Sequence, residues 1–285
     1  MRLKVVCGLD WIFYSANGRY NDTTNKKITS NKAQMPLQPR TAKHARFIKN
    51  TLQKINTDGS VIYACEFDKQ AYRDELFTLL NVNFPDRQKK AVVKRRSEFL
   101  AGRYMAQLAM RTLQQKAQSS FTNGIATFAQ QQVQVGDNRE PIWPEGLQGS
   151  ISHSENKAIC VVKPASPSTF TGLDLEHYAA SSTANELAKF VMSDTEIALI
   201  EKLPLPKHIA FTLVFSAKES LYKALYPYIQ QFFGFDCANL LSVDMHNQTL
   251  CLELNHPKLA TLKFDNCFTC QFSFWQDCLL TQLTG

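Results

Sequence analysis

The sequence lacks any apolar run near the roughly 20 residues that a membrane-spanning helix needs, which disfavours a transmembrane segment. It also lacks a secretory signal, because Asp10 interrupts the short apolar stretch after Met1 and no small-residue cleavage site follows. Of its 285 residues, 44% are hydrophobic and 11% aromatic, which is typical of a folded globular chain. We therefore expect a cytoplasmic protein.

The sequence has eight cysteines but no pattern that indicates a disulfide framework. Cys267-x-x-Cys270, with Cys278 and His256 nearby, is the one arrangement that resembles a zinc site. The surrounding segment alternates like a strand, and residues three apart in a strand face opposite sides. Zinc binding by this pair is therefore disfavoured.

Three catalytic or binding signatures are also missing. There is no Gly-x-x-x-x-Gly-Lys phosphate loop and no Gly-rich dinucleotide fingerprint. The hydrolase elbow Gly-x-Ser-x-Gly is absent, so no Ser-His-Asp triad can be argued.

Charge is unevenly distributed along the chain. Residues 1–150 hold 23 Lys and Arg against 12 Asp and Glu, a net of +11, whereas residues 151–285 hold 9 against 13, a net of −4. A basic first half indicates an anionic partner, which could be nucleic acid, a polyphosphate ligand or an acidic protein.

Hydrophobic periodicity predicts an α+β fold, because strands and helices mix without regular βαβ alternation. Residues 15–60 are polar and predict loop, and Pro164 and Pro167 indicate a boundary between two halves. The pattern predicts strands at 61–67, 150–152, 158–162, 170–175, 241–245, 249–254 and in part of 259–274. It predicts helices at 88–118, 184–191, 194–202 and from 207 past 225.

Gly172-Leu173-Asp174-Leu175-Glu176 places two carboxylates on one face of a predicted strand. Paired carboxylates suit Mg²⁺, which takes oxygen ligands together with substrate phosphates. An exposed acidic strand face is the alternative explanation. In Phe215–Lys223, Glu219 and Lys223 stand one helical turn apart, which, taken alone, is better explained by a solvated surface pair.

Two further segments could bind phosphate. Arg96 and Arg103 lie seven residues apart on the predicted helix and so share a face, although a DNA-binding or merely solvated basic helix would look the same. Ser152 and His153, within Gly149–Ser154, could donate hydrogen bonds to a phosphate, although a lone His is more often structural.

Together these segments resemble the 4′-phosphopantetheinyl transferases, and among them the siderophore-synthesis type, the enterobactin synthase component D-like proteins. The matching stretches span roughly residues 60–225: Ala64–Asp68, Lys94–Arg103, Arg139–Pro144, Gly149–Ser154, Gly172–Glu176 and Phe215–Lys223. The acidic strand and the Lys-Glu-Ser helix are the most specific pair.

The resemblance implies a fold and a reaction. The fold would be a pseudo-twofold pair of similar α+β halves, residues 1–166 and 167–285, with the cofactor in the cleft between them. The reaction would move the 4′-phosphopantetheine arm of coenzyme A onto a serine of an acidic apo carrier protein, with release of 3′,5′-ADP. Because the motifs span both halves of one chain, we also expect a monomer, and no nucleic-acid partner.

The same resemblance implies roles for individual residues. Asp174, Glu176 and Glu219 would bind Mg²⁺. Because the nucleophile is a serine of the partner, we infer in addition that Glu219, directly on the metal or through a bound water, is the candidate catalytic base. Lys223 would contact the pyrophosphate of coenzyme A. Ser152 and His153 would hold its 3′-phosphate, and Arg96 and Arg103 would grip its phosphates and adenosine. Many relatives carry a basic residue just before the proline, whereas this chain has Glu140 there and Arg139 one place earlier, so which of the two contacts coenzyme A stays open.

Two other functions are compatible with parts of the sequence. A nucleic-acid-binding protein would use the Arg95-Arg96 helix but leaves the three carboxylates unexplained. A non-catalytic carrier-binding relative is disfavoured because all three carboxylates and Lys223 are present. The sequence itself does not choose among peptidyl, aryl and acyl carrier domains, although the siderophore-type resemblance favours peptide-synthetase carriers.

Overall fold

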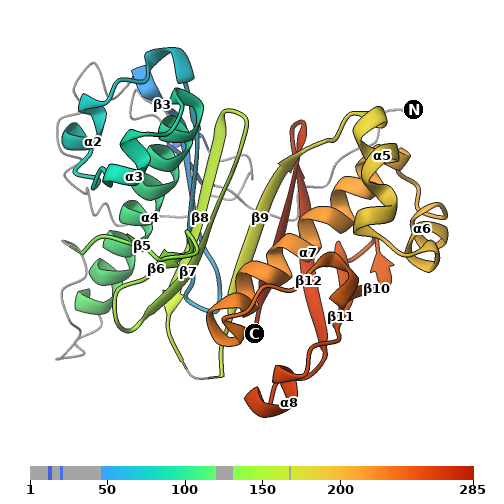
Figure 1. Ribbon diagram of the computed structural model, residues 1–285. Helices are drawn as coiled ribbons and strands as arrows, with labels where there is room; N and C mark the ends of the chain where they lie inside the picture. Colours follow the sequence, from blue (N-terminus) through green and yellow to red (C-terminus); the bar gives the residue numbers. More distant parts are fainter. Residues whose placement is uncertain (1–11, 15–19, 22–45, 120–130, 167) are drawn as a thin grey trace.

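The computed structural model describes residues 12–14, 20–21, 46–119, 131–166 and 168–285. It is a mixed helix and sheet structure with two halves, as the sequence predicts, and each half packs one long helix on an antiparallel sheet (Figure 1). The expectation that no signal peptide is present concerns residues outside the described ones.

The first half is built on a six-stranded sheet of order β2-β1-β3-β4-β8-β7. Its strands are β1 Ile12–Tyr14, β2 Tyr20–Asn21, β3 Ile48–Ile55, β4 Val61–Phe67, β7 Leu147–Ser154 and β8 Lys157–Pro164. The long helix α4, Val93–Ser119, covers one face, where Tyr63, Cys65 and Phe67 of β4 pack against its buried side. Shorter elements complete the half: η1 Lys69–Ala71, α2 Glu75–Leu79, α3 Asp86–Lys89, β5 Gln134–Val135 and β6 Pro141–Ile142.

The second half is built on a five-stranded sheet of order β10-β11-β12-β13-β9. Its strands are β9 Thr171–His177, β10 Ala238–Asp244, β11 Thr249–Leu254, β12 Cys267–Trp275 and β13 Cys278–Thr284. The helix α7, Lys207–Ile229, lies across β9 and β13 as α4 lies across β4 and β8. Flanking it are α5 Ser181–Val191, α6 Asp194–Ile200, η2 Phe235–Cys237 and α8 Lys258–Leu262.

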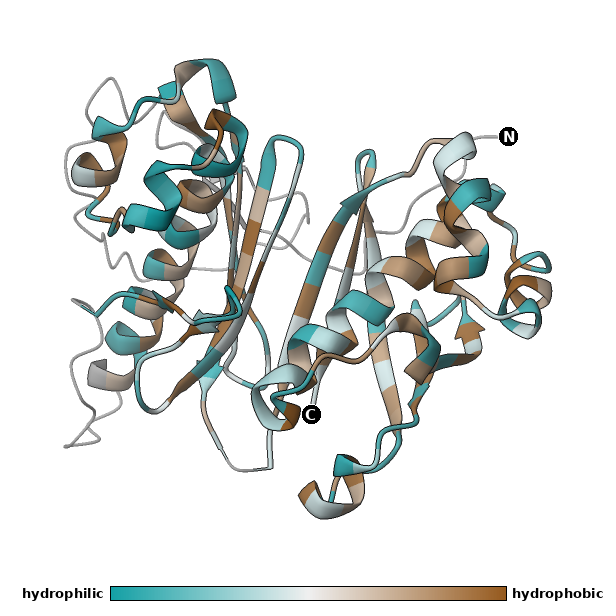
Figure 2. Ribbon diagram, in the orientation of Figure 1, coloured by the Kyte–Doolittle hydropathy of each residue, from teal (hydrophilic) through white to brown (hydrophobic). Residues whose placement is uncertain are grey.

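The two sheets meet through the faces that their long helices leave uncovered. Strand alternation places Ile62 and Ile159 on the inner face of the first sheet and Leu173 and Leu175 on that of the second, where they form one buried cluster. The chain thus has a core under each helix and a third core between the sheets. Figure 2 shows hydrophobic residues along these central strands and hydrophilic residues at their hairpin turns.

Gly172 permits the close approach of α7 to β9. A Cβ atom at this position would lie 2.5 Å from the backbone nitrogen of Ala224 and would also overlap the carbonyl oxygen of Ser220. Because both are backbone atoms of α7, the helix could not yield without leaving the sheet. The glycine that opens the acidic strand motif therefore sets the distance between the helix and the strand carboxylates.

Several elements differ from the sequence prediction. The predicted loop over residues 15–60 is wrong where it covers β3, which pairs with β4. The predicted helix over residues 88–118 begins at Val93, because a turn at residues 90–92 separates it from α3. Residues 258–262 form α8 instead of strand, and β13 was missed although it pairs with β9. Within the described residues, none of the helices is both long and apolar enough to cross a membrane.

Candidate active site

The acidic strand motif lies on β9, directly beneath α7. Leu173 and Leu175 enter the core between the sheets, so Asp174 faces the helix instead. Its side chain is only 2% exposed. The alternative of an exposed acidic strand face is therefore wrong for Asp174.

Both oxygens of the buried Asp174 carboxylate accept hydrogen bonds. Oδ1 accepts from Ser152 Oγ of β7 at 2.8 Å and from Lys223 Nζ of α7 at 2.5 Å. Oδ2 accepts from Ser216 Oγ of α7 at 2.8 Å. A buried carboxylate needs such partners. Asp174 therefore joins the two halves and the helix at one point.

Lys223 belongs to this centre and not to the helix surface. Its side chain is 27% exposed and turns toward β9, where its ion pair is with Asp174. Burial alone would lower the pKa of Lys223, but the charges of Asp174, Glu219 and Glu176 together raise it above its usual value. The alternative of a solvated Glu219–Lys223 surface pair does not describe this geometry.

The other two carboxylates lie around the same lysine. Ser154 Oγ donates to Glu176 Oε2 at 3.2 Å. Burial, and next the charge of Asp174, raise the pKa of Glu176 to about 7. Burial also raises the pKa of Glu219, against the lowering effect of Lys223. Among the described residues, three buried or half-buried carboxylates thus share the Lys223 ammonium, which leaves an excess of negative charge.

This donor set fits a divalent metal ion. It offers oxygen atoms only, as Mg²⁺ prefers, and its excess negative charge is what a dication would balance. The oxygens of Asp174, Glu176 and Glu219 are not among the described ligand atoms that all lie within 4.8 Å of one another. Binding by all three would require the carboxylates to draw together.

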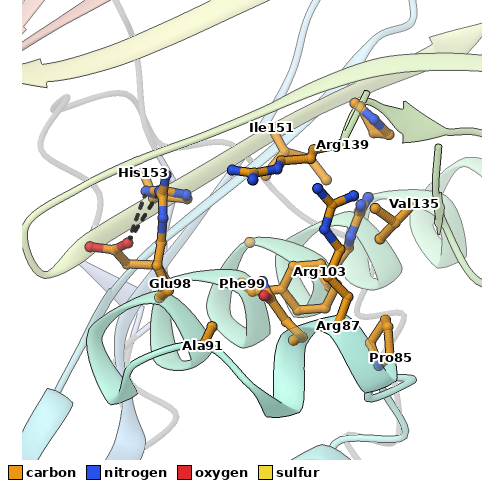
Figure 3. Close-up of a pocket in the computed structure, with 14 residues that line it drawn as sticks. Pro85, Arg87, Ala91, Glu98, Phe99, Arg103, Val135, Arg139, Ile151 and His153 are labelled. Atoms are coloured by element: carbon orange, nitrogen blue, oxygen red, sulfur yellow. Dashed lines mark ion pairs between the residues drawn. The ribbon is translucent and has the colours of Figure 1, made fainter. Parts of the chain in front are cut away.

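A cavity of about 380 Å³ opens on the opposite face of β7. It lies between that strand, the start of α4 and the β5–β6 segment, and four arginines line it: Arg87, Arg95, Arg103 and Arg139. Figure 3 shows Arg87, Arg103 and Arg139 gathered at one end of this pocket and His153 beside Glu98 at the other. So many guanidinium groups in one cavity suit a ligand with several phosphates.

Arg103 is held inside the protein with part of its donor capacity unused. One nitrogen, Nη2, donates to the carbonyl oxygen of Gln134 at 3.1 Å, and the guanidinium lies 5.0 Å from the centre of the Phe99 ring. Burial lowers the pKa of Arg103 to about 10. The buried Nη1 finds no hydrogen-bond partner among the described residues, so an anion in the cavity would supply one.

Arg96 does not join Arg103 in the pocket lining. Its Nη1 donates to Asp74 Oδ2 at 2.6 Å, and its guanidinium lies 5.9 Å from the Tyr72 ring. Seven residues nearly complete two helical turns, but long side chains on one face can still lean toward different partners. Arg95, one position earlier, lines the cavity instead.

Ser152 and His153 are also separated, because neighbouring residues of a strand face opposite sides. Ser152 contacts Asp174 and Lys223, whereas His153 lines the cavity. His153 Nδ1 lies 3.7 Å from Glu98 Oε2. Burial, and next the charges of Lys223 and Arg95, lower the pKa of His153 to about 4, so the ring is neutral at pH 7.

Arg139 and Glu140 differ in the same way. Arg139 lines the cavity, with a left-handed backbone φ of 72° in the β5–β6 turn. The Glu140 side chain is not part of the lining and packs over Gly136 within that turn. The structure thus places Arg139, and not Glu140, where a ligand of this cavity would lie.

Sequence reasoning missed several members of the centre. Ser154 repeats the two-residue spacing of Ser152, and Ser216 precedes Glu219 by nearly one turn, so both carried a usable signal. Thr281 gave none: its hydroxyl lies 2.9 Å from Ser216 Oγ, but it comes from β13, which was itself missed. Lys218, beside Glu219, has another role, because it forms a buried ion pair with Glu196 at 2.8 Å.

Comparison with known proteins finds the same family in both halves. Residues 84–163 match the 4′-phosphopantetheinyl transferase N-terminal domain, and residues 171–269 match the 4′-phosphopantetheinyl transferase superfamily. Enterobactin synthase component D of Salmonella typhi is 33% identical over 194 residues, which are 68% of this chain and 74% of that protein.

Two further relatives are more distant. Enterobactin synthase component D of Escherichia coli strain K12 is 30% identical over 177 residues, 62% of this chain and 76% of that protein. The 4′-phosphopantetheinyl transferase PptT of Mycobacterium tuberculosis is 27% identical over 156 residues, 53% of this chain and 60% of that protein. The two family-model matches together include the residues that line the arginine cavity and all three carboxylates of the centre.

Proposed function

The chain belongs to the 4′-phosphopantetheinyl transferase superfamily, and we propose that it transfers the 4′-phosphopantetheine arm of coenzyme A to a serine of an apo carrier protein. One observation carries the proposal. An arginine-lined cavity of about 380 Å³ and a carboxylate centre lie on opposite faces of one strand, β7, through His153 and Ser152. β7 thus carries both a cationic cavity and an acidic centre, the two features that a pyrophosphate ligand and its metal ion would need.

The arginine cavity would hold the nucleotide end of coenzyme A. Arg103 Nη1 is a free buried donor, and Arg87, Arg95 and Arg139 add charge that phosphates would neutralise. The neutral His153 ring offers one hydrogen bond to the 3′-phosphate. Arg103 and His153 would contact the ligand. Arg96 would instead help to hold α4 in place through its hydrogen bond to Asp74.

The carboxylate centre would hold the pyrophosphate end together with a divalent metal, which we propose is Mg²⁺ bound by Asp174, Glu176 and Glu219. When bound, that ion supplies positive charge to the non-bridging phosphate oxygens. Lys223 contributes a second positive charge and would face the departing 3′,5′-ADP. Ser152 and Ser216 orient the Asp174 carboxylate through hydrogen bonds.

Glu219 is the proposed general base. The carrier serine gives its hydroxyl proton to this carboxylate as its oxygen bonds to the β-phosphorus of coenzyme A, and the bond from that phosphorus to the bridging oxygen breaks. A carboxylate whose pKa is raised by burial accepts a proton more readily near neutral pH.

The remaining proposals concern partners and setting. An acidic carrier would be attracted by the basic first half, which speeds encounter. Because one chain provides every proposed site residue, a monomer would suffice, with the halves divided at residue 166. The seven described cysteines are all free thiols, which fits action in the reducing cytoplasm.

The decisive experiment is to incubate the protein with coenzyme A, Mg²⁺ and apo carrier domains of the peptidyl, aryl and acyl types. Mass spectrometry should show the phosphopantetheine increment on at least one carrier, and the ranking of rates identifies the preferred type. The Asp174→Asn variant is the control for residual transfer. Carrier binding without any mass increase would instead support a non-catalytic binding protein.

A further inference from the structure

A buried carboxylate, Glu98 of α4, lies in the wall of the arginine cavity, and the proposed reaction gives it no role. Its side chain is only 4% exposed. His153 Nδ1 of β7 lies 3.7 Å from Glu98 Oε2, at the end of the pocket away from Arg87, Arg103 and Arg139 (Figure 3). An acidic group is unexpected in a cavity whose other charges suit an anion.

The surroundings of this Glu98–His153 pair are mostly cationic. On the same helix, Lys94 Nζ lies 4.0 Å from Glu98 Oε1 and Arg95 Nη1 lies 3.7 Å from Oε2. These contacts are longer than hydrogen bonds, and burial raises the pKa of Glu98 against their lowering effect. Four further charged groups act on the pair from the elements packed around it: Lys69 and Glu155 on Glu98, and Lys223 and Asp174 on His153.

The one proton of a neutral His153 ring cannot serve both Glu98 and a ligand. Burial lowers the pKa of His153 to about 4, so the free ring carries a single N–H at pH 7. Beside an ionised carboxylate, the favourable neutral form has its proton on Nδ1, and Nε2 is then an acceptor. A phosphate oxygen is also an acceptor, so an Nε2 without a proton would repel it.

A phosphate bound in the cavity changes this balance. Its negative charge stabilises an imidazolium and disfavours an ionised carboxylate close by, so both groups gain affinity for a proton. One added proton removes the conflict wherever it lies. On the ring, it lets Nδ1 donate to Glu98 and Nε2 donate to the phosphate. On Glu98, it lets the carboxyl group donate to Nδ1 while Nε2 carries the ring proton toward the phosphate.

We propose that Glu98 and His153 act as one proton-accepting pair, which takes up a proton from solvent when a phosphate group binds beside His153. The inference rests on the proposed function in one respect, that the nucleotide end of coenzyme A occupies this cavity. Glu98 is then a positioning residue that acts through His153. The pair would favour a ligand with a phosphate at this place over one with an uncharged hydroxyl, because only the phosphate stabilises the added proton.

Calorimetric titration of the full-length protein with 3′,5′-ADP measures this proton. The binding heats in buffers of different ionisation enthalpy give the number of protons taken up. Mg²⁺ is left out so that metal binding by the carboxylate centre does not contribute, and the pH range of 7.5 to 8.5 lies above the phosphate's own pKa of about 6. We expect uptake of about 0.5 to 1 proton at pH 7.5 and a Kd about 3- to 10-fold weaker at pH 8.5.

Glu98→Gln distinguishes proton uptake from a structural role. Its amide has the same size and can donate to His153 Nδ1, which leaves the ring proton on Nε2 for the phosphate without any added proton. The variant should bind 3′,5′-ADP without proton uptake and with a Kd that no longer changes with pH. Damage to the structure would instead weaken binding at every pH. If Glu98→Gln does not fold, His153→Gln serves the same test, because it should also lose the uptake.

Glu155→Gln is the matched control. It removes the same charge from a more exposed carboxylate, whose ion pairs are with Lys69 and Lys94, and it should keep the proton uptake. Uptake that persists in Glu98→Gln, or that disappears in Glu155→Gln, would overturn the inference. Binding of 3′,5′-ADP to the wild type without uptake would also overturn it and leave the proposed function intact, whereas no binding at all would contradict both.

Discussion

Lys223 Nζ lies 2.5 Å from Asp174 Oδ1, so the most buried carboxylate of the centre and the lysine beside it are bound to each other. Breaking a buried ion pair from one side leaves an uncompensated charge, which costs about 3–5 kcal/mol. Asp174→Asn should therefore lower the free energy of unfolding by about 3 kcal/mol as well as abolish transfer.

A double-mutant cycle with Lys223→Met checks this by urea unfolding. The double variant should be more stable than the sum of the two single effects implies, because neither charge is then left alone. Additive losses would contradict the coupling. Transfer at a normal rate by folded Asp174→Asn would contradict the role of Asp174 in catalysis.

Glu219→Gln keeps the size of the side chain but removes a negative ligand and the proposed base. We expect a fall in kcat of at least about 100-fold. Mg²⁺ titration of the transfer rate separates the two roles: extra Mg²⁺ should improve binding of the ion without restoring kcat. Full recovery of kcat at high Mg²⁺ would show that Glu219 is a metal ligand and not the base. Lys223→Ala is the comparison, because it should lower the rate while changing the Mg²⁺ dependence less.

Arg103 and Arg96 form a matched pair on one helix, one in the cavity and one paired with Asp74. Arg103→Met should raise KM for coenzyme A by about 10-fold or more, because a charged hydrogen bond to phosphate is lost. Arg96→Met should leave KM unchanged and cost at most about 1 kcal/mol of stability, since its partner is half exposed. Equal effects of the two substitutions on KM would refute this assignment.

His153 is expected to recognise the 3′-phosphate, which dephospho-coenzyme A lacks. His153→Ala should raise KM for coenzyme A and narrow its advantage over dephospho-coenzyme A. The measurement is kcat/KM for both substrates with wild type and variant. A loss of the same factor with both substrates would show that His153 acts elsewhere, for example in holding Glu98.

The lowered pKa of His153, about 4, also predicts a pH effect on stability. Between pH 4 and the unfolded value of about 6.5, the unfolded chain binds a proton that the native ring does not. The stability difference between wild type and His153→Gln should therefore rise with pH across this window and level off above it. Unfolding at a series of pH values tests this, with the exposed His246→Gln as control. A difference that falls with rising pH would contradict a neutral buried ring.

The sequence predicted those features whose pattern lies within a single helix or strand, and it failed for features that depend on contacts between distant residues. The strand alternation around Asp174 and the helix spacing of Glu219 and Lys223 are local, and both elements lie where their patterns predict. Whether Arg96 or Arg95 enters the cavity was not local, because it depends on Asp74, 22 positions away. β13 lacked a recognisable pattern of its own, since it is buried on both faces by α7 and the first half.

The serines of β7 have a consequence for aggregation. β7 and β9 are the edge strands of their sheets, and an edge strand exposes backbone groups to which another chain can add. Here each edge covers the other: Ser152 Oγ accepts from the backbone nitrogen of Leu175, and Ser154 Oγ from that of His177. The hydroxyls that orient the carboxylates thus also protect both edges. A variant that separates the two halves would expose two aggregation-prone edge strands at once.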